Sequence, residues 1–148
     1  MPRHSPVFYD EALVTETLDA IAAERGRFDR SFTLVDDLLA RMGETNLAKR
    51  LYSGIPTQRP WKDVADLFEI LCWSTSDNGS AIMRQVERWL ISTDDARLVQ
   101  IALHLDAYPF LDRGTMERVL CEVAERVPEV GQLCRDRIQS RRRLPGGA

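Results

Sequence analysis

Few residues of this chain could carry acid–base, nucleophilic or metal chemistry. Its 148 residues include two histidines, His4 and His104, and three cysteines, Cys72, Cys121 and Cys134. Acid–base catalysis needs titratable groups that converge in one pocket, and zinc sites need cysteines and histidines at short spacings. The sequence has neither pattern, and it has no phosphate-binding glycine loop. We therefore expect a non-catalytic protein with no metal ligands and no cofactor.

The cysteines indicate a reducing environment. Each lies among apolar residues at helical spacing, and no two form a CxxC pair. An odd number without ligand spacing predicts reduced, buried thiols. The N-terminus lacks the apolar core of a signal peptide, and no apolar run approaches the roughly 18 residues of a membrane span. We therefore expect a cytoplasmic protein that does not enter a membrane.

One segment has a motif-like pattern that points to DNA. Residues 38–54, LLARMGETNLAKRLYSG, resemble a helix-turn-helix, and residues 60–71 resemble the packing helix that follows it in repressor-type domains. The resemblance depends on a glycine turn and a short polar helix. It departs from the motif at Lys49 and Glu44, where apolar residues are usual. It implies an alternative function as a DNA-binding regulator that would use Arg41, Asn46, Lys49, Arg50, Tyr52 and Arg59.

The helix predicted from Pro60 to the turn at 74–79 is apolar on almost every side. Its polar stripe consists of Lys62, Asp63, Asp66 and Glu69, and the apolar Ile70 and Trp73 lie within that stripe. Large apolar residues among charges are typical interface anchors, although another helix of the same chain could equally cover them. A second nearly apolar helix, 95–106, has a narrow polar stripe of its own. The predicted protein interface comprises Asp66, Glu69, Ile70, Trp73, Arg97, Gln100 and His104.

These residues must be positioned by helices, because no segment alternates as a strand does. Eight segments show helical spacing, at about 10–25, 31–42, 45–52, 60–74, 80–92, 95–106, 115–126 and 128–140. The length suits one domain. We expect an all-α fold, a single compact domain of seven to eight helices, arranged as a helical bundle or a short HEAT-like α-solenoid.

Charge is unevenly distributed along this domain. Residues 1–128 carry 15 basic and 21 acidic side chains, whereas residues 129–148 carry 5 and 2. We expect a flexible N-terminus at 1–9, the helical domain at 10–140 and a disordered basic tail at 141–148.

The functional hypothesis is a protein-interaction module that binds another protein through an acidic helical surface. A toxin-neutralising immunity protein or an adaptor of a conflict system is a concrete form of it, because acidic surfaces complement basic, nucleic-acid-directed toxins. The sequence does not distinguish a monomer from a homodimer.

Overall fold

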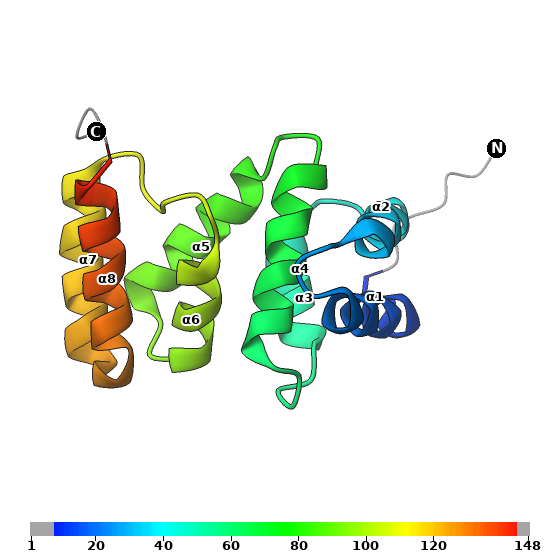
Figure 1. Ribbon diagram of the computed structural model, residues 1–148, viewed down its shortest axis with the longest axis horizontal. Helices are drawn as coiled ribbons and strands as arrows, with labels where there is room; N and C mark the ends of the chain where they lie inside the picture. Colours follow the sequence, from blue (N-terminus) through cyan, green and yellow to red (C-terminus); the bar gives the residue numbers. More distant parts are fainter. Residues whose placement is uncertain (1–7, 145–148) are drawn as a thin grey trace. The chain divides into compact units, whose positions relative to one another are not determined.

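The computed structural model describes residues 8–144, and these residues form eight α-helices, one short 3₁₀-helix and no strand (Figure 1). The all-α class predicted from the sequence is therefore confirmed. The elements are α1 (Glu11–Glu24), α2 (Asp29–Met42), α3 (Leu47–Gly54), α4 (Trp61–Ser74), α5 (Ser80–Ser92), α6 (Ala96–His104), α7 (Arg113–Arg126), η1 (Pro128–Val130) and α8 (Gly131–Arg142).

The chain divides into two compact units, and the division falls within α5, between Ile82 and Met83. The domain expected over residues 10–140 thus contains two units. The expected N-terminal segment 1–9 lies outside the described residues up to position 7, while Phe8 and Tyr9 are described.

The first unit is built around α1, α2 and α4, each of which contacts the other two. Leu18, Val35 and Phe68, one from each helix, are completely buried. The carboxylate of Asp10 caps α1 by accepting a hydrogen bond from the Leu13 N–H at 3.1 Å, as its place before the first apolar residue predicts. The chain leaves α1 through Arg25 and Gly26, both at positive φ, a backbone conformation that commonly ends a helix.

Helix α2 begins earlier than the apolar pattern predicts, at Asp29 rather than near Ser31. The cause is Glu24, at the end of α1. Its carboxylate accepts hydrogen bonds from the backbone N–H groups of Arg30, at 2.9 Å, and Ser31, at 2.8 Å, and from the Ser31 hydroxyl. These bonds satisfy N–H groups that the first turn of a helix leaves unpaired. They also lower the pKa of Glu24, with the Ser31 hydroxyl as the largest cause.

The second unit contains the helical hairpin of α7 and α8, which pack against each other, and α6, which contacts α8. Ile101, Leu120 and Cys134 are buried in this unit. Pro128 was expected to open the last helix, but it opens η1, and α8 begins only at Gly131.

The expectation of a disordered basic tail from residue 141 is wrong at its start, because α8 continues through Arg142. Arg141 is only 7% exposed. A run of three arginines followed by proline and glycines has the composition of a solvated tail, and its composition does not show that the first arginine points inward. Residues 145–148 lie outside the described part of the chain.

Candidate functional site

Trp73, in the last turn of α4, is a large apolar side chain on the surface of the first unit. It is 66% exposed, whereas Ile70 is buried. Ile70 follows the buried Leu67 by three residues and therefore lies on the same side of the helix. Treating Ile70 as a contact residue is therefore wrong. Trp73 alone of this apolar pair is accessible, and Glu69, one turn before it, is half-buried.

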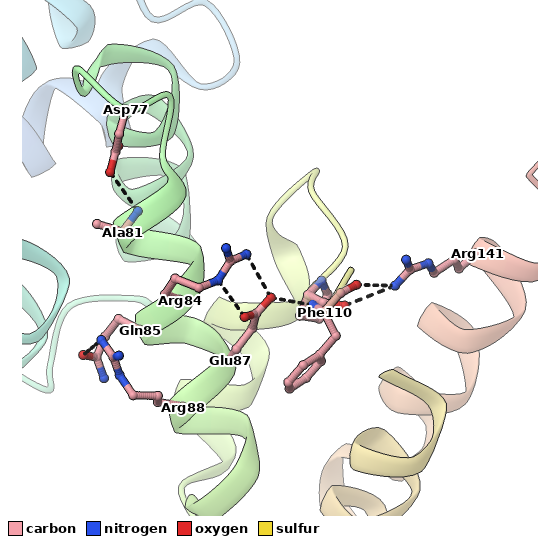
Figure 2. Close-up of polar contacts among 9 residues, drawn as sticks. Asp77, Ala81, Arg84, Gln85, Glu87, Arg88, Phe110 and Arg141 are labelled. Atoms are coloured by element: carbon pink, nitrogen blue, oxygen red, sulfur yellow. Dashed lines mark hydrogen bonds and ion pairs between the residues drawn. The ribbon is translucent and has the colours of Figure 1, made fainter. Parts of the chain in front are cut away.

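The turn that follows Trp73 is held by side-chain hydrogen bonds. The Asp77 carboxylate accepts from the backbone N–H of Ala81 at 2.9 Å (Figure 2). It also accepts from the backbone N–H of Gly79 at 3.1 Å. The bond from Ala81 is the largest of the causes that hold the pKa of Asp77 below its ordinary value. The Glu44 carboxylate accepts from the Ser76 N–H, at 3.2 Å, and hydroxyl, at 2.9 Å. The turn that follows Trp73 is therefore held in place by acidic side chains.

A cavity of about 290 Å³ lies near the other end of α4, and we call it the α4 cavity. It is lined by Ile21, Arg25, Gly26, Phe28, Lys62, Asp63 and Asp66. The polar stripe of α4 was expected to face solvent, but Asp63 is only 6% exposed and Asp66 is half-buried. The stripe is covered here because the end of α1, at Ile21, and the start of α2, at Phe28, line the cavity beside it. Lys62, which lines the same cavity, remains exposed.

The remaining predicted interface residues, Arg97, Gln100 and His104, lie on α6. All three are half-buried. Asp95 fixes the start of this helix by accepting hydrogen bonds from the N–H groups of Arg97, at 3.0 Å, and Leu98, at 3.4 Å. Because α6 belongs to the second unit and α4 to the first, the predicted interface set is divided between the two units.

The segment that resembles a helix-turn-helix does contain a helix, a glycine turn and a short helix. Three of its cations, however, already have partners within the first unit. Arg41 pairs with Asp10 at 3.1 Å, and Arg59 pairs with Asp19 at 2.7 Å. Arg50 donates to the carbonyl oxygens of Thr45, Gly43 and Phe8, so its guanidinium serves to close the turn.

The outer side of α3 nevertheless carries polar groups. Asn46 and Lys49 are exposed and Tyr52 is half-buried. Lys49 and Asn46 line a second cavity, of about 630 Å³, together with Met42 and Phe8. Asn46 has φ 51°, the left-handed conformation that asparagine tolerates better than most residues.

The thiols differ more than their sequence surroundings predict. Cys134 is buried and Cys72 is half-buried, but Cys121 is exposed, so the prediction of three buried thiols is wrong. Cys121 follows the buried Leu120 on α7 and points about 100° away from it around the helix. Burial raises the pKa of Cys72 to about 12 and that of Cys134 to about 11. Within residues 8–144, no three His, Cys, Asp or Glu side chains gather to hold a metal ion. His4 lies outside that range.

Two arginines of α8 hold the loop between α6 and α7, residues 105–112. Arg141 donates to the carbonyl oxygens of Pro109 at 3.2 Å, Phe110 at 2.9 Å and Leu111 at 2.8 Å. Arg137 donates to the carbonyl oxygens of Leu105, Asp106 and Ala107, and its guanidinium lies 4.2 Å from the centre of the Tyr108 ring. Sequence reasoning missed this cluster because it joins residues about thirty positions apart.

The same loop is also held from α5. Glu87 accepts a hydrogen bond from the Phe110 N–H at 2.6 Å, and it pairs with Arg84 at 2.8 Å (Figure 2). Phe110 has φ 66°, an uncommon conformation for a phenylalanine. The loop is therefore rigid even though it presents Leu111, which is 97% exposed.

No protein-family model matches this chain, and no curated protein or solved structure shows significant similarity to it. No helix among residues 8–144 has both the length and the apolar character needed to cross a bilayer. Any functional assignment must therefore come from the geometry and charge of the chain itself.

Proposed function

We propose that this protein is a non-catalytic interaction module that binds a basic protein through the first unit, with Trp73 as the central anchor. The exposure of Trp73 carries the proposal. Tryptophan is enriched among the residues that contribute most to binding, and burying it removes a large apolar surface from water. The fixed turn beneath Trp73 limits the conformational entropy lost when a partner binds.

Charge defines the kind of partner. Residues 1–82 carry 9 basic and 13 acidic side chains, whereas residues 83–148 carry 11 and 10. Glu69 and Asp77 flank Trp73 in sequence. A basic partner would be attracted to this unit before contact, which raises the association rate at low salt. Neutralisation of a basic toxin, or an adaptor role in a conflict system, is one concrete form of the proposal.

The test begins with the partner that the tagged protein retains from cells that produce it. Its affinity for the purified wild type is then compared with that for Trp73→Ala and for Ile91→Ala, a second exposed apolar residue on α5. We expect Trp73→Ala to weaken binding about thirtyfold or more and Ile91→Ala to change it less than about threefold. Equal effects of the two substitutions would contradict the role of Trp73. An association rate that does not change with salt would contradict the electrostatic part.

DNA binding through α3 is the second candidate, favoured by the exposed Lys49 beside Asn46 on a short helix after a glycine turn. Polarisation of labelled mixed-sequence duplex DNA at low salt separates the two functions. A DNA-binding module should bind at or below about 10⁻⁴ M, the weak end of non-specific affinity, and Lys49→Ala should weaken that binding. Absence of binding at that concentration would exclude this candidate.

A further inference from the structure

The α4 cavity contains a carboxylate whose hydrogen-bonding capacity is unused. Asp63 is nine-tenths buried, and no hydrogen bond or ion pair reaches its carboxylate from the other residues between 8 and 144. A buried carboxylate normally accepts several hydrogen bonds, because removing it from water without them is costly. Its oxygens are not sealed within the protein, and the side chain lines the cavity. The group is therefore open to a donor from outside.

The surroundings of Asp63 supply no donor to its carboxylate. Asp63 lies in the first turn of α4, where the helix dipole stabilises an anion. The cations in the cavity wall, Arg25 and Lys62, are exposed and form no ion pair with it. Water can satisfy these two cations, so they need no partner. A ligand would instead supply the hydrogen bonds that the buried Asp63 carboxylate lacks.

Three features identify the chemistry of that ligand. Asp63 and Asp66 are three residues apart on one side of α4, and both line the cavity. The C-terminal end of α1, which carries partial negative charge and is capped by the exposed Arg25, meets the same space at Ile21 and Gly26. Phe28 and Ile21 add an apolar wall. A planar cation on an alkyl stem fits all three, since guanidinium groups pair with carboxylates and stack on aromatic rings.

The size of the cavity indicates how much of a ligand enters. About 290 Å³ is at the lower limit of pockets that hold drug-sized molecules, so one side chain or a small fragment would fill it. We propose that the α4 cavity binds the guanidinium group of an arginine side chain presented by a protein partner. The identity of the source as a protein rests on the function proposed above, whereas the cation preference rests on the cavity alone.

The first experiment tests the cavity without a partner. N-acetyl-arginine methylamide is titrated into the full-length ¹⁵N-labelled protein, and the neutral citrulline analogue of the same shape is the control. We expect saturable shifts of the Asp63, Gly26 and Phe28 amide signals with the arginine probe only. Equal shifts with the citrulline probe, or shifts elsewhere in the protein only, would overturn the cation preference.

Two substitutions with opposite expected effects strengthen this test. Asp63→Asn removes the charge with little change of shape and should weaken binding of the arginine probe about tenfold or more. Arg25→Gln removes a competing positive charge from the wall and should tighten binding about two- to threefold, since exposed charges are well screened. Should Asp63→Asn fail to fold, the Arg25→Gln result decides alone. No change or weaker binding in that variant would overturn the proposal.

The second experiment identifies the source of the cation. The affinity of Asp63→Asn for the partner that Trp73 helps to bind should fall about tenfold or more. Binding of the arginine probe combined with unchanged partner affinity would mean that the cavity takes a free small cation, and it would overturn the protein source. If Trp73→Ala leaves the affinity for the partner unchanged while the arginine probe still binds, the proposed function is contradicted and the cation site is not.

Discussion

At the scale of single residues, nearby positions on a helix can have opposite environments. On α7, Leu120 is completely buried and Cys121 is exposed. On α4, Ile70 is buried and Trp73 is exposed, although both interrupt the same polar stripe. A rotation of about 100° separates Cys121 from Leu120, and one of about 60° separates Trp73 from Ile70, so either rotation can carry a side chain from the core to water. Reactivity should therefore differ sharply among residues of one type.

The thiols offer a direct check at this scale. Only the thiolate form of cysteine is an effective nucleophile, and burial raises the pKa of Cys72 to about 12 and of Cys134 to about 11. At pH 8 we expect one thiol of the native protein to react rapidly with a disulfide reagent and two to react only as the protein opens. Cys121→Ser should abolish the fast phase. A fast phase that survives this substitution would contradict the exposure pattern.

Some of the candidate site is predictable from residue patterns, and some is not. Trp73 stands out because an indole within a charged stripe conflicts with helical amphipathicity. Asp63 shows no such conflict, since an acidic residue in the first turn of a helix is ordinary. Its burial depends on Arg25, Phe28 and the end of α1, roughly forty positions away, and a pattern read within one helix contains no information about them.

At the scale of elements, the contribution of α8 to the loop at 105–112 can be measured. Arg141→Ala removes a buried guanidinium and leaves the carbonyl groups of Pro109, Phe110 and Leu111 without a donor. We expect it to lower the free energy of unfolding by about 2–4 kcal/mol, measured by urea denaturation.

Arg143→Ala is the matched control, two positions later in the same run of arginines. Arg143 is exposed, and its substitution should change stability by less than about 0.5 kcal/mol. Similar losses in both variants would mean that overall charge, rather than the contacts of Arg141, determines the effect.

The turn between α4 and α5 provides a second test at this scale. Gly79 has φ +83°, and a Cβ there would lie 2.8 Å from the Cβ and 2.9 Å from the Cα of Cys72. Gly26 has nearly the same φ, +86°, but a Cβ there would meet no atom within 4 Å. Gly26→Ala should cost about 1–2 kcal/mol of unfolding free energy for its conformation alone. Gly79→Ala should cost about 1–3 kcal/mol more, for the steric clash. Equal costs would show that the turn relaxes freely.

Element boundaries are predictable where the signal is local. Asp10 and Asp95 stand directly before helices and cap them, and the expected limits of α5, Ser80–Ser92, are confirmed. The start of α2 is not predictable in this way, because Glu24 reaches it from another helix. The same applies to Arg141, whose partners come from the loop between α6 and α7. Side chains that act across elements leave no periodic signal in the sequence.

At the scale of the whole molecule, several carboxylates couple folding to pH. The pKa values of Asp10, Glu24, Asp77, Asp112 and Glu117 are all lowered, the first, third and fourth chiefly by backbone N–H donors, and the other two chiefly by the side chains of Ser31 and Arg142. A lowered pKa means that the unfolded chain binds protons more readily than the folded one. The stability these groups provide is complete above the unfolded values, near 4, and is lost as the pH falls through the folded values.

We therefore expect the free energy of unfolding to be nearly constant from pH 7 to about 5 and to fall steeply below about 4. Urea denaturation at several pH values measures this dependence. Asp77→Asn should reduce the steepness at low pH, whereas Asp36→Asn, at an exposed position on α2, should not. Stability that rises on acidification would contradict the assigned hydrogen bonds.

The loop at 105–112 is translated before Arg137 and Arg141, the two arginines of α8 that hold it. Residues 105–112 leave the ribosome about thirty residues before Arg137 and Arg141, which is roughly 1.5 to 6 s at ordinary elongation rates. During that interval the loop has neither guanidinium to bind its carbonyl groups. The Glu87 carboxylate of α5, which is translated earlier, can still accept from the Phe110 N–H, but the carbonyl groups of the loop have no guanidinium donor. Until α8 is translated, this loop lacks the contacts of Arg137 and Arg141 and is therefore more accessible to chaperones and proteases than it is in the folded protein.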